Sequence, residues 1–501
     1  MARWLWQFLK LDAIVERHLP VGKHTARPAD IVAIEVINRL CAPCSEFALA
    51  EHWYASTGLE DLLGIGDDAV TKDRLYRTLD ALLQVKDAIE TDLKGELATL
   101  FDLDYELLLY DLTSTYFEGL AEENDLARRG YSRDHRRDCK QIVLALVVTR
   151  DGFPLAHFSL AGNTRDGDTV KQLVTAVEKR FGKSQRVWVM DRGMLSAANL
   201  RCLSRSPRRY LIALRRSSLA KFAAALTRPD WQRLADNDEV EVKAVRRGRL
   251  TYLLARSLPR RHKERAIRKR QFLQLHRGLH KLRRRISAGR LKDRDKMLEA
   301  LGHLKSKYPK ATPLVRIKAL PERPTTLTWT WDVTKIKEVL ARDGAYVLRT
   351  NQAGWSATEL WETYIQLTTV EKAFRVLKSE LLLRPVWHHY SGRTQAHVFI
   401  CVLAYALWKA LDHLLKQASL QTTIRKSDPQ RPHAAPKPRP MTPEVALREL
   451  RKIQIGDIVL ETTDGQKLAL RRVARPDTEQ SRILKALQLE LPERLSPDRL
   501  L

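Results

Sequence analysis

Three acidic side chains have the type and spacing that metal-dependent chemistry on phosphodiesters requires. Asp111 and Asp191 each follow a short apolar run, in LLLYDLT and VWVMDRG, which predicts two buried strands that end at these aspartates. Glu371 lies in YIQLTTVEKAFRVLKSEL, where the apolar spacing predicts a helix. Mg²⁺ prefers oxygen ligands, and two such ions can activate the attacking oxygen and stabilise the leaving one. Turn or cap roles for the aspartates, and surface ion pairs for the glutamate, are the alternatives.

The predicted helix around Glu371 covers residues 357–381 and places one acid and one base beside apolar side chains. Steps of three or four residues bring side chains onto one face of a helix. The residues with this spacing are Tyr364, Leu367, Glu371, Phe374 and Lys378. His388 and His389 follow this helix and could contact DNA or lie near a metal, but ordinary loop positions are the simpler interpretation.

The elements that must position the two aspartates form a mixed α/β pattern over residues 101–215. Predicted strands and helices follow there in the order β-β-β-α-β-α-β, with Asp151-Gly152 as a hairpin turn. A further predicted strand, residues 345–349, precedes the helix of Glu371. We therefore expect residues 101–215 and 341–417 to form one α/β core.

The rest of the chain divides by composition, and 501 residues are enough for two to four domains. Residues 1–100 are expected to form a helical domain, and 216–340 a basic insertion that contains strands and helices. Residues 418–443, rich in Pro, Lys and Arg, predict a linker. Residues 444–501 predict a mostly helical C-terminal region with a hairpin around Asp464-Gly465.

The insertion contains a dense run of positive charge between Arg260 and Lys307. Its apolar residues recur at steps of three and four, which predicts a helical hairpin that turns at Gly289. We expect its cations to bind DNA phosphates, with a solvated helix face as the alternative. The candidates are Arg268, Lys269, Arg270, Arg283, Arg284 and Arg285. Trp329 and Trp331 alternate on a predicted strand and could stack on an unpaired base, although packing within the insertion is the simpler interpretation.

The overall charge predicts a polyanionic partner. The chain has 88 Lys and Arg against 60 Asp and Glu, a formal net charge of +28, which would attract DNA, RNA or an anionic membrane. The longest apolar run, residues 398–408, is too short to cross a bilayer and predicts a buried helix, so no membrane partner is expected.

Five cysteines fit a reducing cytoplasm. Cys41 and Cys44, with His52 nearby, could bind a metal, but ordinary packing is favoured.

Four segments resemble the DDE transposases of bacterial insertion sequences. They are YDLTSTYFEG, GNTRDGDT, VWVMDRGM and YIQLTTVEKAFRVLKSELLLRPVWHH. The most similar branch has a Tyr-x₂-Arg-x₃-Glu-x₆-Lys signature and a β-rich insertion before the final Glu. The resemblance spans about residues 30–410 and implies that Asp111, Asp191 and Glu371 are the catalytic, metal-binding residues.

The resemblance also implies contacts with the DNA backbone. Tyr364 and Lys378 match the signature Tyr and Lys, which are expected near the backbone at the transposon end. Leu367 stands where the signature has Arg. Arg375, one turn beyond Glu371, is the candidate to replace that contact.

The family further implies a ribonuclease H-like core and two Mg²⁺ ions per active site, with Mn²⁺ as a possible substitute. The helical N-terminal domain would bind the inverted terminal repeats of double-stranded DNA, within a homodimer or larger synaptic complex. Hydrolysis at the element's end would free a 3′-OH that attacks target DNA, in some relatives through a hairpin intermediate. The expected location is the bacterial cytoplasm, in association with the nucleoid.

Two other interpretations are compatible with the same residues. A ribonuclease H-like nuclease would use the same carboxylates without strand transfer. A catalytically inactive remnant of a mobile element would bind DNA only. A metalloprotease or glycosidase is less well supported, because the sequence has no His-rich zinc motif and its charge favours nucleic acid.

Overall fold

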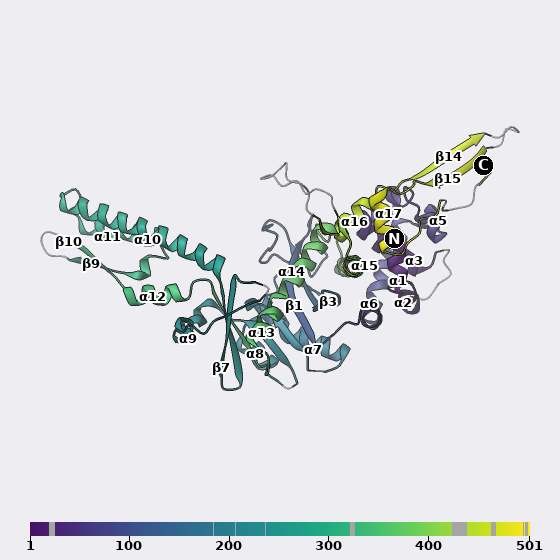
Figure 1. Ribbon diagram of the computed structural model, residues 1–501. Coiled ribbons are helices and arrows are strands. Elements are labelled where there is room, and N and C mark those ends of the chain that lie inside the picture. The colour runs from purple at the N-terminus through teal and green to yellow at the C-terminus, as the bar shows by residue number, and fades with distance from the viewer. Residues whose placement is uncertain are drawn as a thin grey trace. The chain divides into compact units, whose positions relative to one another are not determined.

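The structure is a computed structural model, whose contacts divide the chain into two units (Figure 1). The first unit comprises Met1–Arg186 and Gln366–Leu501, and the second comprises Val187–Ile365. The structure describes residues 1–501 apart from 20–25, 184, 206, 236, 321–325, 423–437, 462–466, 494, 496–498 and 501. The predicted turn at Asp464-Gly465 and most of the predicted linker at 418–443 lie outside the described residues. The predicted domain boundaries remain predictions.

Helices from both ends of the chain form the apolar core of the first unit. They are α1 Ala2–Phe8, α2 Leu11–His18, α3 Pro28–Cys41, α4 Glu46–Ala48, α5 Leu59–Leu63, α6 Lys72–Phe101 and α15 Ser391–Gln417. α3 is buried along nearly its whole length, because its apolar residues occur on all sides of the helix. α15 packs against both α3 and α6, so a late segment of the chain completes the N-terminal helical core.

α15 is long and apolar enough, by length and composition, to cross a membrane, and no other helix in the described ranges meets that test. Its place is inside the first unit, where 78% of its most apolar window is buried. The apolar run at residues 398–408 is therefore a buried helix, as predicted. Core helices of large domains have the same composition, since they are surrounded by apolar side chains on every face.

The sheet of the first unit has three antiparallel strands in the order β3-β2-β1. Their bounds are β1 Leu107–Tyr116, β2 Gln141–Thr149 and β3 Pro154–Ala161. The prediction that the first strand ends at Asp111 was wrong, because β1 continues through Thr113, Ser114 and Thr115. The Ser114 and Thr115 hydroxyls are buried but find partners: Ser114 Oγ accepts from the Arg133 amide, and Thr115 Oγ1 donates to the Leu383 carbonyl. A polar run can therefore stay within the strand.

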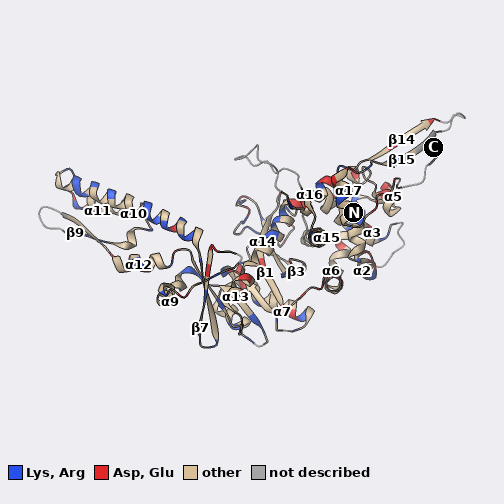
Figure 2. Cartoon of the chain, in the orientation of Figure 1, with Lys and Arg blue, Asp and Glu red and all other residues tan. Residues whose placement is uncertain are grey.

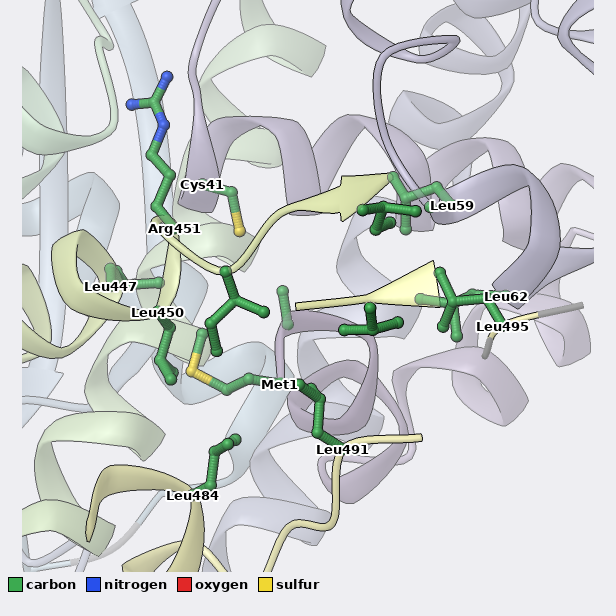
Figure 3. Close-up of a pocket in the computed structure, with 15 residues that line it drawn as sticks. Met1, Cys41, Leu59, Leu62, Leu447, Leu450, Arg451, Leu484, Leu491 and Leu495 are labelled. Atoms are coloured by element: carbon green, nitrogen blue, oxygen red, sulfur yellow. The ribbon is translucent and has the colours of Figure 1, made fainter. Parts of the chain in front are cut away.

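The first unit also contains the helix of Glu371 and the C-terminal elements. The helices are α7 Asp166–Phe181, α14 Leu367–Arg375, a π-turn at Val376–Glu380, α16 Pro443–Leu450 and α17 Thr478–Ala486. The strands are β12 Gln421–Thr422, β13 Arg439–Pro440, β14 Ile455–Glu461, β15 Lys467–Val473 and β16 Arg499–Leu500. An apolar cavity of about 290 Å³ lies among α1, α3, α5, α16 and α17 (Figure 3). Met1, Cys41, Leu59, Leu450 and Leu484 are among its lining residues, and no predicted site residue lines it.

The second unit has a six-stranded mixed sheet in the order β4-β5-β11-β8-β7-β6. The strands are β4 Val187–Met190, β5 Arg209–Ala213, β6 Gln232–Arg233, β7 Val240–Arg247, β8 Leu250–Ser257 and β11 Ala345–Thr350. β4 and β5 are parallel, and the other pairs are antiparallel. The unit's shorter helices are α8 Ala197–Leu203, α9 Ala223–Thr227, α12 Val333–Ala341 and α13 Ala357–Ile365. The α/β class predicted from the sequence is confirmed at this level.

The predicted helical hairpin of the insertion is present in the second unit. It consists of α10 Leu258–Ser287 and α11 Arg294–Lys307, and Gly289 turns the chain with a φ of +69° that favours glycine. The predicted seam is buried at Leu275, Leu279 and Leu282. The antiparallel strands β9 Val315–Leu320 and β10 Thr326–Trp331 accompany the hairpin.

The predicted single helix at 357–381 is interrupted at Gln366, which corrects the expectation of one continuous face. α13 packs against strands β5, β7 and β8 of the second unit. α14 packs against β1 and β2 of the first unit. The two halves bury their apolar residues on different partners, which explains the break. Tyr364 therefore belongs to the second unit, and Glu371 belongs to the first.

Candidate active site

Asp111 lies in the middle of β1, directly opposite Leu146 of β2. Its neighbours Tyr110 and Leu112 are buried, whereas Asp111 is partly exposed. Side chains alternate along a strand, so Asp111 shares a face with Thr113 and Thr115. Thr115 on that face donates to the carbonyl of Leu383, which follows the helix of Glu371. Asp111 therefore lies on the face of β1 that contacts the segment after α14, at Leu383.

Glu371 lies on α14, which packs against β1 within the same unit. Val370 and Phe374 are buried and anchor the helix. The Glu371 side chain is exposed, so its carboxylate is available to a ligand. Leu367, at the place of the signature Arg, is buried with 9% exposure, so this chain uses that position for packing. Arg375, the proposed replacement, is exposed.

Asp191 comes directly after β4 in the second unit, as predicted for a strand that ends at this aspartate. It is exposed and precedes a short 3₁₀ turn at Arg192–Met194. The hydroxyl of Tyr364 donates to Asp191 Oδ1 at 3.4 Å. Burial, together with the charge of Asp191, raises the pKa of Tyr364 far above its usual value, so this hydroxyl stays protonated and acts as a donor.

The three carboxylates offer the hard oxygen donors that a divalent cation such as Mg²⁺ takes. Asp111 and Glu371 come from the first unit, and Asp191 comes from the second. Each of them is at least partly exposed, so water, a metal ion and a phosphate can reach its oxygens. The donor chemistry therefore fits a divalent metal centre.

Lys378 is placed differently from what a DNA contact would need. Only 9% of it is exposed, and its ammonium donates to Asp134 Oδ1 at 2.8 Å. Arg384 forms a second ion pair with the same carboxylate, whose side chain is 5% exposed. Burial lowers the pKa of Lys378, and Asp134 opposes that effect. The signature Lys is thus held inside the protein by an aspartate that the sequence did not single out.

The predicted cations of α10 divide into two groups. Arg268 is paired with the fully buried Asp343, so it stabilises the second unit. The others are exposed and lie along the helix, where Figure 2 shows a dense row of basic residues. They are Lys269, Arg270, Arg283, Arg284 and Arg285. These side chains are available to phosphates, and their DNA contacts remain predictions.

Trp329 and Trp331 lie on one face of β10, as predicted, and that face packs against α10. The Trp331 ring centroid is 3.8 Å from that of Phe272, and the Trp329 ring meets His280 at 4.9 Å. Arg283 lies over Trp329 at 4.9 Å. Both indoles are partly buried, so the packing interpretation describes this structure, and base stacking would need them to move.

A buried polar cluster joins α4, α15 and the loop after the Glu371 helix. Within the described residues, Glu46, His388 and His397 are the one group of three whose potential metal-ligand atoms lie within 4.8 Å of one another. His388 Nε2 is 3.4 Å from Glu46 Oε1, and His397 Nδ1 is 3.9 Å from it. The guanidinium of Arg39 lies 3.4 Å from the same oxygen. An internal cation therefore already compensates the Glu46 carboxylate.

This cluster corrects the interpretation of His388 as an ordinary loop histidine, because His388 is buried and bonded to Glu46. His389 is exposed, as a loop residue would be. Burial opposes ionisation of Glu46, but hydrogen bonds from the two histidines hold the pKa of Glu46 well below its usual range. The sequence has no spacing signal for this cluster, because its members are far apart along the chain.

The cysteine pair belongs to the packing of the first unit. The Cys44 thiol and amide lie against the Asn38 side chain. Cys41 lines the apolar cavity of Figure 3, and burial raises the pKa of its thiol to about 11. In the described parts of the chain, neither cysteine joins His52 in a group of three metal ligands.

The fold and the candidate site define a mixed α/β protein that has three at least partly exposed candidate carboxylates and also carries strongly basic elements. Residues 103–407 match the family model described as the transposase DDE domain. This match covers well over half of the chain, so the chain belongs to the DDE-domain family of transposases.

A cryo-EM structure of a piggyBac transposase synaptic complex with hairpin DNA is similar over 83% of this chain and 76% of that chain, with 10% identity and a TM-score of 0.39. The sequence search of curated proteins returned no match.

Proposed function

We propose that this transposase binds the inverted terminal repeats of an insertion sequence, cleaves DNA there and joins the freed 3′-OH to target DNA. The observation that carries the proposal is the match to the DDE family over the segment that contains Asp111, Asp191 and Glu371. Each of these residues lies in a motif predicted for its role, and each has an accessible carboxylate.

Each site residue has a distinct means of being held in place. Asp111 is fixed within β1, and Glu371 is fixed through the buried anchors Val370 and Phe374 on its helix. Tyr364 orients the Asp191 carboxylate through its hydroxyl. Mg²⁺ or Mn²⁺, two ions held by these three acids, would supply activation of the attacking oxygen and stabilisation of the leaving one. The basic row on α10 would hold the DNA backbone.

The proposal also names the DNA partners, the assembly and the cellular location of the reaction. Double-stranded DNA is the partner, both as transposon ends and as target, and the N-terminal helices would contact the terminal repeats. A homodimer or larger synaptic complex would bring two ends together. The ribonuclease H-like topology and the location at the bacterial nucleoid belong to the same proposal and rest on the family resemblance.

The decisive experiment compares three proteins on labelled DNA that carries the element's own ends, with Mg²⁺ present. We expect the parent and Asp238→Ala to cleave and join DNA, because Asp238 is an exposed acid of the second unit outside the proposed site. Asp191→Ala should bind DNA equally but yield no product. Equal cleavage by Asp191→Ala would show that the active site lies elsewhere.

Two other outcomes separate the competing functions. Cleavage by the parent without joining of a precut 3′-OH end would indicate a nuclease. DNA binding by the parent with no product in Mg²⁺ or Mn²⁺ would indicate an inactive remnant.

A further inference from the structure

A second basic segment lies in the first unit, in the connection between β1 and β2. We call residues 128–140 the basic loop, and its sequence is RRGYSRDHRRDCK. Five arginines and one lysine stand there against two aspartates. The charge density resembles that of α10, but the loop has no helical seam, so its shape must come from tertiary contacts.

The basic loop is anchored to the elements that carry two of the proposed catalytic acids. Arg128 and Gln141 exchange two backbone hydrogen bonds at the start of β2. The Arg133 amide donates to Ser114 Oγ at 3.0 Å, three residues beyond Asp111 on β1. Asp134 of the loop binds Lys378, which follows the helix of Glu371. Ser114 lies on the face of β1 opposite to that of Asp111, so the loop is anchored to the strand that carries Asp111 and to the segment after the helix of Glu371.

Some of the loop's cations form ion pairs within the protein, and others do not form one with the described residues. Arg133 pairs with Asp166, and Arg136 pairs with Glu118 and Asp138. Arg128, Arg129 and Arg137 have exposed side chains and make no ion pair with the described part of the chain. Within the described residues, three exposed guanidinium groups of the loop are therefore not used in ion pairs.

Three exposed aromatic rings lie in the basic loop and in the segment after Val386, which is joined to the end of β1. The Tyr131 carbonyl accepts from the Gln141 side chain, and Gln141 pairs with Tyr116 at the end of β1. On the other side, the Val386 amide donates to the Tyr116 carbonyl at 2.9 Å, which anchors the segment that contains Trp387. The exposed fractions are 81% for Tyr131, 62% for Trp387 and 52% for Tyr390.

We propose that this basic-aromatic surface, made of Arg128, Arg129, Tyr131, Arg137, Trp387 and Tyr390, binds a stretch of DNA whose bases are unpaired. Guanidinium groups pair with phosphates, and aromatic rings stack on exposed base faces. A closed duplex hides those faces, so three exposed rings favour an opened strand. In the loop sequence Tyr131 stands between Arg129 and Arg137, and this combination of exposed cations and aromatic rings favours nucleic acid over a protein partner.

The inference rests on the proposed function for the choice of DNA as the nucleic acid. It goes beyond that function because it assigns the opened strand to a surface on the first unit, apart from the α10 row and from the proposed catalytic and signature residues. The loop's anchors at Ser114 and Lys378 would place such a strand on the unit that carries Asp111 and Glu371. A reaction on one DNA strand needs a DNA end that is unpaired.

The test uses a fluorescein-labelled oligothymidine of about 20 nucleotides and a duplex of the same length, with anisotropy as the readout. We expect Arg129→Glu with Arg137→Glu to weaken oligothymidine binding at least tenfold and to reduce its salt dependence by about 1.4 log units per log unit of salt, for two lost phosphates. Trp387→Ala should weaken oligothymidine binding roughly tenfold and affect the duplex less.

The matched control is Lys171→Glu with Lys179→Glu, which makes the same charge change at exposed positions of α7 in the same unit. Circular dichroism melting of all variants checks that they are folded. Oligothymidine binding equal to that of the parent in both loop variants would overturn the inference, as would an equal loss in the α7 control. Cleavage assays on Asp191→Ala test the proposed function separately, so either idea can fail while the other stands.

Discussion

Tyr364 is the residue through which α13 reaches a proposed catalytic acid. Its hydroxyl donates to Asp191 Oδ1 at 3.4 Å, and its raised pKa keeps it a donor. It acts on Asp191 and is therefore a positioning residue in this structure.

We predict that Tyr364→Phe slows DNA cleavage about fivefold, because loss of one modest hydrogen bond costs roughly 1 kcal/mol of orientation. DNA affinity should stay unchanged, since the aromatic ring is retained. Single-turnover cleavage and filter binding measure the two quantities. A loss of affinity with an unchanged cleavage rate would show that the hydroxyl contacts DNA instead.

His397 is the residue that most clearly links stability to pH. It is buried beside Arg39, Glu46, His388 and Cys401. Burial, followed by the charge of Arg39, lowers the pKa of His397 to about 4. As the pH falls, the unfolded chain binds a proton at this imidazole near pH 6.5, whereas the folded chain binds it only near pH 4. The neutral imidazole therefore contributes stability above that pH, and the contribution is lost as the pH falls toward 4.

We predict that the free energy of unfolding decreases between pH 6.5 and pH 4 by up to about 1.4 kcal/mol per pH unit from this group. His397→Gln should have a shallower slope, and the exposed His303→Gln should behave like the parent. Urea unfolding at several pH values measures the slopes. Identical slopes for all three proteins would contradict the assignment.

At the scale of elements, the Asp134 ion pairs attach the basic loop to the chain that follows the helix of Glu371. Lys378 and Arg384 both bind this carboxylate in a mostly buried position. Removal of one partner of a buried pair leaves an uncompensated charge, which costs more than the pair itself contributes.

We predict that Asp134→Ala destabilises the first unit by about 3–5 kcal/mol, because Lys378 then stays buried without a counter-charge. Lys378→Met should cost less, since Arg384 still pairs with Asp134. Guanidinium unfolding monitored by circular dichroism gives both values. A cost below about 1 kcal/mol for Asp134→Ala would show that Lys378 can turn to solvent and reach DNA.

At the scale of the whole molecule, the chain combines a net charge of +28 with two chemically different groups of potential metal-ligand side chains. Asp191 and Glu371 are exposed and Asp111 is partly exposed, and the Tyr364 hydroxyl, a neutral donor, contacts Asp191. The buried Glu46 cluster already contains Arg39. The two groups should therefore respond differently to metal removal.

We predict that chelation of divalent cations abolishes DNA cleavage but leaves the thermal midpoint of unfolding unchanged. The reaction needs the ion, whereas Arg39 compensates the buried cluster without one. Calorimetry before and after dialysis against chelator, with cleavage assays on the same samples, measures both. A lowered midpoint that Zn²⁺ restores would place a structural metal at Glu46, His388 and His397.

Much of the fold could be predicted from local patterns. Runs such as VWVMD and the steps of three and four in the insertion depend on neighbours a few residues away, so they revealed β4, Asp191 and the α10–α11 hairpin. The β1 strand was predicted too short, because the partners of Ser114 and Thr115 come from distant segments.

The motifs, charge and residue types by themselves determined the α/β class, the choice of the three candidate acids and the transposase family of this protein. Only the tertiary structure decided that the 357–381 helix breaks at Gln366, that Lys378 binds Asp134 and that Glu46 meets His388. Asp134 and Lys378 are 244 residues apart in the chain. The physical reason is the distance along the chain over which each interaction acts. Periodicity depends on neighbouring residues and indicates which residues share an element, whereas buried charges are paired only when elements that are distant in the sequence pack together.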